Sequence, residues 1–302
     1  MKEKIFSILI STKNRCDDLI FTLNKLQDLL IREDVEFIVY DDGSDDGTFC
    51  YIQNNYPDIV LKRNEVSKGY LYCRNEMLNQ TEAMYAVSLD DDAHFLTTNP
   101  LEKIQNYFDS NAQCGLIAFR IFWGLTEPVN SISVEVPQRV QSFVGCAHVW
   151  RMKAWQNIPD YPEWFIFYGE EDFGSYQLFK KDLEVHYLPE ILVNHRVDMK
   201  LRKNNSDYYI RLRSSLRSGW FLCFLFYPKR IILRKMSYSI WQQLHLKVFK
   251  GDFKILQVIV LALLDLFKAL PKIIRNSNRL AEKEFRNFEK LSATKIYWQP
   301  KI

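Results

Sequence analysis

Short apolar segments alternate with helical patterns in the first ninety residues, and this alternation restricts the fold more than any other feature. The apolar segments are rich in β-branched and aromatic residues and cover residues 4–12, 35–42, 58–63 and 83–90. The segments between them, 17–31, 47–57 and 69–80, have helical spacing or helix-start residues. Apolar strands that alternate with helices are typical of a parallel sheet covered on both faces. We therefore predict an α/β fold with a mostly parallel sheet flanked by helices.

Polar residues follow three of these predicted strands. The first strand leads into Ser11, Thr12, Asn14 and Arg15, the second into "DDGSDDGT" at 41–48, and the fourth into Asp90, Asp91 and Asp92. The carboxyl ends of parallel strands meet at one edge of a sheet, where such folds bind ligands. We therefore expect these side chains to share one site.

The three consecutive aspartates in "AVSLDDDAHF" need a physical explanation. Neighbouring carboxylates repel one another, and burial makes their ionisation costlier. A turn or a helix cap explains one acid, and it remains an equal alternative for "DDGSDDGT". A divalent cation would offset the repulsion among several carboxylates. Oxygen ligands suit Mg²⁺ or Mn²⁺, which also bind phosphates.

Four motifs in order resemble the family 2 glycosyltransferases of the GT-A fold, over about residues 4–200. They are "FSILISTKNR", "VEFIVYDDGSDDGT", "SKGYLYCRNEML" and "AVSLDDDAHF". The resemblance implies a Rossmann-like sheet that binds a nucleotide-sugar. It implies that Asp42 lies near the nucleobase and that Arg74 lies close to the nucleotide. The remaining nucleotide-binding residues that it implies are Ser11, Thr12, Asn14, Arg15, Asp90 and Asp91.

The same resemblance implies a metal site. The triple Asp matches the family's DxD motif, so Asp90 and Asp92 become metal ligands for Mn²⁺ or Mg²⁺. His195 closes the strand "LPEILVNHR", where some family members place a further metal ligand. A purely structural role for His195 is an equal alternative, and we expect structural roles for His94, His148, His186 and His245.

The segment "YPEWFIFYGEEDFGSYQLFKKD" matches the place of the family's catalytic base. The resemblance implies that Asp172 is the base, with Glu171 as the second candidate because a third acid, Glu170, extends the motif. Acids in a first helical turn also interact favourably with the helix dipole, so a structural role stays open. Gly145 and Cys146 would allow a sugar to approach the backbone, and a structural turn is a nearly equal alternative. Trp123 and Trp164 could stack on sugars, although most aromatic residues belong to the core.

The implied function is transfer of a sugar from a nucleotide-diphosphate sugar to a hydroxyl group, with inversion. A UDP-sugar is the leading donor, GDP and dTDP are open, and the acceptor is a glycan or lipid-linked sugar of a bacterial surface polysaccharide. A nucleotidyltransferase is an alternative, but "ISTKNRCDD" has no glycine for a phosphate loop. A non-catalytic sugar-binding protein on the same fold is another. No nucleic-acid-binding motif is present.

The charge is distributed unevenly along the chain. Residues 1–198 contain 18 Lys and Arg against 31 Asp and Glu, whereas residues 199–302 contain 22 against 6. We predict a catalytic domain at 1–215, with a nucleotide-sugar half to about 97 and an acceptor half from about 98, and a basic helical region at 216–302. The six scattered cysteines fit a reducing cytoplasm.

The C-terminal region contains "FKILQVIVLALLDLFKAL", whose polar residues share one helical stripe. The charged residues Lys254, Asp265 and Lys268 within this segment argue against a simple membrane span. Apolar helix faces edged by Lys and Arg lie well at a bilayer interface. We predict peripheral attachment to an anionic membrane at its cytoplasmic face. The alternative is that these helices pack on the catalytic domain or on a second subunit.

Overall fold

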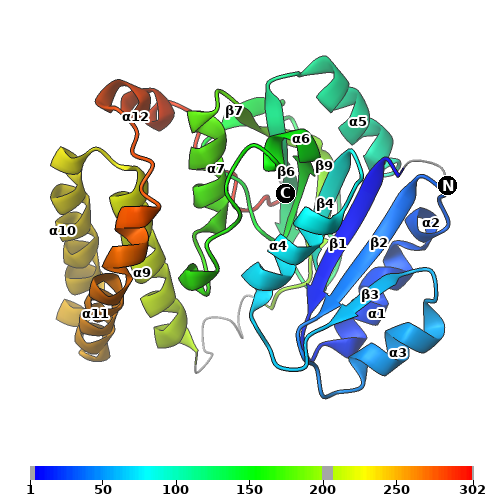
Figure 1. The fold of residues 1–302 in the computed structure, drawn as a ribbon, viewed down its shortest axis with the longest axis horizontal. Helices are drawn as coiled ribbons and strands as arrows, with labels where there is room; N and C mark the ends of the chain where they lie inside the picture. Colours follow the sequence, from blue (N-terminus) through cyan, green and yellow to red (C-terminus); the bar gives the residue numbers. More distant parts are fainter. Residues whose placement is uncertain (1–3, 199–206, 301–302) are drawn as a thin grey trace.

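The structure is a computed structural model that describes residues 4–198 and 207–300. One mixed sheet has the strand order β3-β2-β1-β4-β8-β6-β9-β5, and β7 pairs with β9 at one side (Figure 1). The first four strands in this order run parallel to one another, as the sequence predicts. Their bounds are β1 Phe6–Thr12, β2 Val35–Asp41, β3 Val60–Arg63 and β4 Tyr85–Asp90.

The helices of this half connect its parallel strands. They are α1 (Cys16–Lys25), α2 (Gln27–Leu30), α3 (Thr48–Asn55) and α4 (Tyr70–Gln80). The single helix predicted for 17–31 is divided between α1 and α2, because the chain leaves helical geometry at Leu26. The other two predicted helices form as α3 and α4.

The second half of the sheet is not all parallel. The strand β8 (Ala147–Arg151) runs antiparallel to both β4 and β6 (Cys114–Trp123), while β6 and β9 (Glu184–His195) run parallel. The short strands β5 (Ala93–Phe95) and β7 (Gln138–Val140) each pair antiparallel with β9. The helical elements here are α5 (Pro100–Ser110), α6 (Met152–Trp155), η1 (Glu163–Phe165) and α7 (Glu170–Lys180).

Helices between residues 208 and 289 form a separate layer beside α7 (Figure 1). These are α9 (Tyr208–Phe226), α10 (Lys229–Leu246), η2 (Val248–Lys250), α11 (Lys254–Arg275) and α12 (Glu282–Glu289). The predicted helical region therefore forms. Its predicted start at residue 216 lies inside α9, and the division of the chain at that point stays a prediction.

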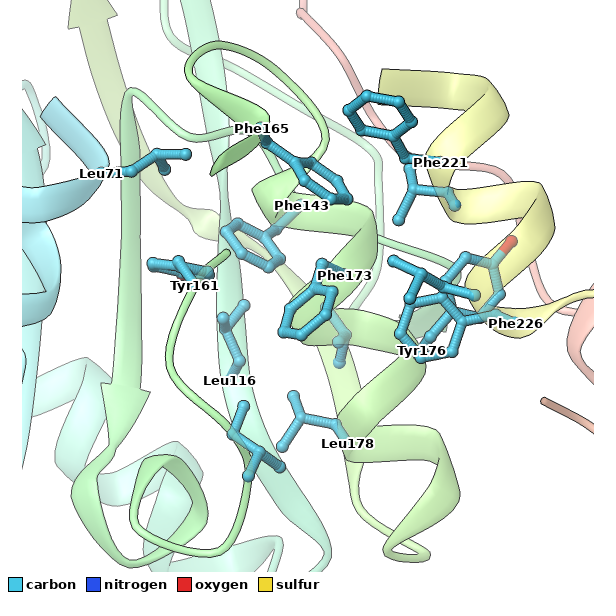
Figure 2. Close-up of a cluster of buried hydrophobic side chains, with 14 of the residues drawn as sticks. Leu71, Leu116, Phe143, Tyr161, Phe165, Phe173, Tyr176, Leu178, Phe221 and Phe226 are labelled. Atoms are coloured by element: carbon cyan, nitrogen blue, oxygen red, sulfur yellow. The ribbon is translucent and has the colours of Figure 1, made fainter. Parts of the chain in front are cut away.

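Two apolar clusters cover the two faces of the sheet. Alternate residues of a strand point to opposite faces, so Ile8 and Ile10 pack in the cluster under α1, α3 and α5, while Leu9 packs in the other. This second cluster contains α4, α6 and α7 and continues into α9, α11 and α12. Figure 2 shows the contact between α7 and α9, where Phe173 and Tyr176 meet Phe226, while Phe221 packs against Phe165.

This shared core decides part of the question about the C-terminal helices. The rings of Tyr176 and Phe226 are stacked 4.9 Å apart, and Tyr176 also packs against Phe288 of α12. The helical layer therefore packs on the catalytic part through one side. Within residues 4–198 and 207–300, no helix is long and apolar enough to cross a membrane.

Candidate active site

The sheet brings the predicted polar residues to one edge. In the parallel pairs at the centre of the sheet, Ser11 is opposite Asp90 and Thr12 is opposite Asp41. On the antiparallel side, His195 at the end of β9 is opposite Ala93, next to Asp92. Residues from three distant parts of the chain therefore meet where β1, β4 and β9 end.

Each of the three consecutive aspartates has different partners. Asp90 accepts a hydrogen bond of 2.6 Å from Arg74. Asp91 is buried, accepts a hydrogen bond of 2.8 Å from the Thr12 hydroxyl and lies 3.2 Å from a guanidinium nitrogen of Arg15. Asp92 lies 2.7 Å from Arg15. The repulsion expected among these acids is thus offset by cations of the protein itself.

Asp92 also forms an ion pair with His195, the third predicted metal ligand. The His195 Nε2 atom is 3.0 Å from Asp92 Oδ1 and 3.9 Å from Asp90 Oδ2. Burial would raise the pKa of Asp92, but His195 and Arg15 lower it to about 2. Burial would lower the pKa of His195, yet Cys146 and the Asp92 carboxylate raise it to about 11. The middle acid behaves in the opposite way, since burial raises the pKa of Asp91 to about 7.

Asp90, Asp92 and His195 also satisfy the geometry of a metal site. One potential ligand atom from each lies within 4.8 Å of the others. Two carboxylates and one imidazole form a donor set that Mn²⁺ accepts, and the carboxylates alone suit Mg²⁺. A histidine binds a metal through a deprotonated ring nitrogen, so metal binding here would compete with protonation of His195. These residues fit the divalent ion that the sequence predicts.

The Asp42 carboxylate is surrounded by donors from the loop before α4. Asn64 Nδ2 and the Lys68 backbone N–H donate to Oδ1 at 2.7 and 2.8 Å, and the Ser67 hydroxyl and the Gly69 backbone N–H donate to Oδ2 at 2.6 and 2.9 Å. Burial would raise the pKa of Asp42, but these hydrogen bonds lower it. A carboxylate has about four lone-pair sites. The loop already occupies them, so Asp42 fixes the loop that leads into α4.

Asn14 and Arg15, in the loop after β1, fix this loop to the segments that follow β2 and β4. Asn14 has a φ of 53°, its N–H donates to Ser44 Oγ, and its Oδ1 accepts from the Asp45 N–H at 2.8 Å. Arg15 joins the start of α1 to Asp91 and Asp92. The two loops that follow β1 and β2 are thereby locked together.

Arg74 connects the strand-end acids to the start of α7. It is buried, donates to Asp90 and to the Gly145 carbonyl oxygen at 2.9 Å, and lies 3.5 Å from Glu170. A Cβ atom on Gly145 would lie 3.0 Å from Glu171 Oε1 and 3.2 Å from Arg74. Glycine at this position therefore allows Arg74 and the acids of α7 to approach the backbone.

The acids at the start of α7 differ in their surroundings. Glu170 is buried against Arg74, and Glu171 accepts a long hydrogen bond of 3.3 Å from the Gly145 N–H. Burial, together with the nearby Glu170, raises the pKa of Glu171 well above its usual range. The Asp172 side chain lines the pocket and is open to solvent on the pocket side. The surrounding protein raises its pKa through burial, and a hydrogen bond with the Ser142 hydroxyl partly offsets this effect. Asp172 is thus the acid of α7 best suited to exchange a proton with a bound molecule.

A pocket of about 670 Å³ connects these groups. This volume lies within the range of small-molecule sites. Seven of the predicted residues line it, namely Ser11, Arg74, Asp90, Asp91, Glu171, Asp172 and His195. The other five, Thr12, Asn14, Arg15, Asp42 and Asp92, lie outside its lining and contact the loops or the acids described above.

Some of the aromatic residues and histidines considered in the sequence analysis line the pocket, and the others lie outside it. Trp123 and Cys146 line the pocket, and Trp123 packs edge-on against His195. Trp164 instead packs against Phe165 and Phe221 in the core. The other histidines lie outside the pocket lining, in contacts with Arg196 for His94, Phe143 for His148, Glu184 for His186 and Trp241 for His245.

Sequence reasoning missed one whole wall of the pocket. This wall is formed by Ser215, Ser218, Gly219 and Leu222 of α9 and by Thr294 and Ile296 of the C-terminal segment. That segment is bound to the sheet edge, since the Trp298 N–H donates to the Ile121 carbonyl oxygen at 2.6 Å and the Gln141 N–H donates to Ser292 at 2.9 Å. No local motif marks these residues, because their position depends on packing with residues far away in the sequence.

The fold and the grouped acids define an enzyme of the GT-A type, in which a mixed sheet carries a metal-binding acidic motif at a strand end. The chain belongs to glycosyl transferase family 2, whose model matches residues 7–173. The prediction of the family is confirmed, and with it the prediction of an enzyme that transfers a glycosyl group. A search of curated proteins finds no match.

Solved structures support the same fold. The chain superposes on GalNAc-T7 with UDP, GalNAc and Mn²⁺ with a TM-score of 0.58 at 14% identity, over 76% of this chain and 49% of that chain. It superposes on residues 1–349 of Staphylococcus aureus TarS with UDP with a TM-score of 0.58 at 17% identity, over 89% of this chain and 82% of that one.

A third structure is the mannosyltransferase PcManGT from Pyrobaculum calidifontis with GDP-Man and Mn²⁺. Its TM-score is 0.56 at 14% identity, over 90% of this chain and 76% of that chain. The chain spans about half the length of GalNAc-T7 and 39% of a longer TarS structure. These identities establish a shared fold.

Proposed function

We propose that the chain transfers a sugar from a nucleotide-diphosphate sugar to a hydroxyl group, with inversion at the anomeric carbon. One observation carries this proposal: the Asp90–Asp92–His195 group and the Asp172 carboxylate are associated with one pocket of about 670 Å³. A cation site for a leaving diphosphate and a carboxylate for an attacking hydroxyl are the two functions that this reaction needs.

The metal group would hold the nucleotide end of the donor. Asp90, Asp92 and His195 would bind Mn²⁺ or Mg²⁺, which when bound supplies positive charge that stabilises a departing diphosphate. Around it, Asp42 and Asn14 fix the loops that follow β2 and β1. Ser11, Thr12, Arg15, Arg74 and Asp91 complete the proposed nucleotide-binding set.

Asp172 would act as the general base. It accepts the proton of the acceptor hydroxyl while the oxygen forms a bond to the anomeric carbon. The bond from that carbon to the diphosphate oxygen breaks, and its electrons leave with the nucleotide. Attack from the side opposite the leaving group inverts the configuration. Glu171 is the second candidate, but its strongly raised pKa favours the protonated form, which cannot accept a proton.

The donor and acceptor follow from weaker observations. UDP is the preferred nucleotide because two of the similar structures are named with UDP, and GDP is second because of PcManGT. We propose a hexose as the sugar and a glycan or lipid-linked sugar as the acceptor, in the synthesis of a bacterial surface polysaccharide. The reaction would take place at the cytoplasmic face of the membrane.

A thermal-shift screen followed by a transfer assay tests this function. UDP, GDP and dTDP are compared with and without Mn²⁺, and a ligand at 100 times its Kd stabilises the folded state by about 2.7 kcal/mol. We expect a shift with UDP that requires Mn²⁺, and then incorporation of the matching sugar into an acceptor. No shift with any nucleotide, or release of pyrophosphate in place of a nucleoside diphosphate, would contradict the proposal.

A further inference from the structure

The helix α11 has two apolar faces, although packing requires only one. Its inner face packs in the core through seven residues: Ile255, Val258, Ile259, Ala262, Leu266, Ala269 and Ile273. On the other side, Leu256, Val260, Leu264, Phe267 and Ile274 are 45–71% exposed. At about 100° per residue these five side chains fall within an arc of about 80°, opposite the inner face. We call these five residues the outer face.

The outer face continues into the segment before α11. Phe253 and Phe249 are 70% and 66% exposed, and Phe249 lies 6.0 Å from the ring of Trp241 on α10. In Figure 1, α10 and α11 lie side by side on the far side of α9 from the sheet. The exposed apolar side chains therefore lie on the part of the helical layer most distant from the sheet.

Cations border the outer face, while the acids of this region turn inward. Lys254, Lys268, Lys272 and Arg275 are exposed, and they occupy the helical angles next to the apolar arc. Asp265 instead accepts hydrogen bonds of 2.7 and 2.6 Å from Arg213 of α9, and Asp252 accepts one from Tyr209. Residues 229–276 contain ten Lys and Arg against two Asp and Glu.

We propose that the outer face is the surface by which the enzyme binds an anionic lipid bilayer. An apolar stripe edged by Lys and Arg can insert between lipid headgroups while its cations contact lipid phosphates. A second copy of this chain fits less well, because a symmetric contact would place the same cations opposite one another. The inference rests on the proposed function in one respect, since a lipid-linked acceptor would be found at such a surface.

The geometry links this surface to the pocket. One side of α9 lines the pocket through Ser215, Ser218, Gly219 and Leu222. Arg213 of the same helix is paired with Asp265 of α11. A bilayer on the outer face would therefore hold the pocket at a fixed distance, with only α9 and α11 between them.

The test is flotation of the full chain with vesicles of phosphatidylcholine alone or with phosphatidylglycerol added. We expect recovery with the anionic vesicles, little with the neutral ones, and a fall in recovery as salt rises. The variant L256Q/V260Q/L264Q should lose at least about tenfold in vesicle affinity. The variant K268Q/K272Q should lose about fivefold for each cation. These side chains are exposed, and a thermal melt of each variant checks that it is folded.

A matched control replaces exposed apolar residues away from α11. Val129, Ile132 and Val134 are 94%, 78% and 77% exposed in the loop after β6, and V129Q/I132Q/V134Q should float like the parent. Equal recovery of the parent with both vesicle types, or with neither, would overturn the inference. So would a dimer in solution that the outer-face variant abolishes without any vesicle binding.

A second readout separates this inference from the proposed function. The outer-face variant should transfer sugar to a water-soluble acceptor at the parental rate, because none of its residues lines the pocket. Flotation without sugar transfer by the parent protein would leave the surface intact and reject the proposed reaction. Sugar transfer without flotation would support the proposed reaction and reject the membrane-binding surface.

Discussion

The two sides of the pocket treat their carboxylates differently. At the strand ends, Asp42 accepts four hydrogen bonds from one loop, and Asp92 lies against both Arg15 and His195. The pKa values of Asp42 and Asp92 are lowered, although burial raises that of the neighbouring Asp91. At the start of α7, burial raises the pKa values of Glu171 and Asp172. Acids held ionised suit fixed binding of cations, whereas an acid with a raised pKa suits proton transfer. The comparison therefore predicts which substitution changes binding and which changes turnover.

The largest effect is expected when the metal group is removed. Excess EDTA should abolish sugar transfer, and Asp92→Asn should do the same because it removes one ligand and weakens the pair with His195. The matched control is Asp18→Asn, since Asp18 also bonds Arg15 at 2.9 Å but lies outside the metal group. Transfer at the parental rate in EDTA, measured as sugar incorporated, would disprove a metal requirement.

Removal of the proposed base comes next. Asp172→Asn should lower kcat by about 10²–10⁴-fold, the usual contribution of general base catalysis. Nucleotide affinity, measured by calorimetry, should change little, because Asp172 belongs to α7 and not to the metal group at the strand ends. Glu171→Gln is the comparison variant and should retain more activity. An inactive Glu171→Gln enzyme beside an active Asp172→Asn enzyme would move the role to Glu171.

The same contrast predicts a pH dependence. A base acts only when ionised, so kcat should fall as pH decreases through the pKa of Asp172. Because burial raises that pKa, the fall should begin at a higher pH than for an ordinary aspartate. The measurement is kcat against pH at saturating donor, acceptor and metal. If kcat of the Asp172→Asn enzyme still fell at the same pH, the fall would belong to the titration of another group.

A smaller effect is expected at Asp42. In Asp42→Asn one oxygen becomes an NH₂ group, which cannot accept the two hydrogen bonds now made to that oxygen. Each bond to a charged group contributes about 1.5–3 kcal/mol, so the free energy of unfolding should fall by about 3 kcal/mol. Nucleotide affinity should also decrease, because the loop that Asp42 holds leads into α4 and Arg74. Asp45→Asn is the control, since Asp45 is exposed on the preceding loop.

The smallest effect is expected on the wall that the C-terminal segment adds. Ile296 lines the pocket and is 57% exposed. Ile296→Ala should raise the acceptor KM a few-fold, on the order of 0.8 kcal/mol for each CH₂ group that the acceptor buries. The donor KM should stay constant. A change in the donor KM alone would place the donor sugar against this wall, and Ile132→Ala serves as the exposed control.

The sequence predicts the strand-end side of the site better than the helix side. The parallel strands and the acids that follow them are local patterns, so the place of Asp90 and Asp92 at the sheet edge could be expected, whereas His195 is suggested only by the family resemblance. The partners of Asp42 could not, because Asn64, Ser67 and Gly69 reach it through a loop conformation that no periodicity encodes. Nor could the antiparallel placement of β8 between β4 and β6, which depends on pairing over long separations.

The same limit applies to the C-terminal helices. Helical spacing predicts α11 and its single polar stripe, and it leaves open which part of the apolar surface meets the protein. The structure answers through tertiary contacts, in which Ile255 and Ile259 are buried and Leu256 and Val260 are exposed. Sequence periodicity indicates that a face is apolar, but what covers it depends on the rest of the molecule.

The anchoring of Trp298 to Ile121 has a consequence for the order of folding. The strand-end side of the site needs little beyond residue 195, and domains generally fold from the N-terminus during synthesis. The wall that carries Thr294 and Ile296 is added only after α9, α10, α11 and α12 have been synthesised. The strand-end side of the pocket can therefore be in place before this wall has been synthesised.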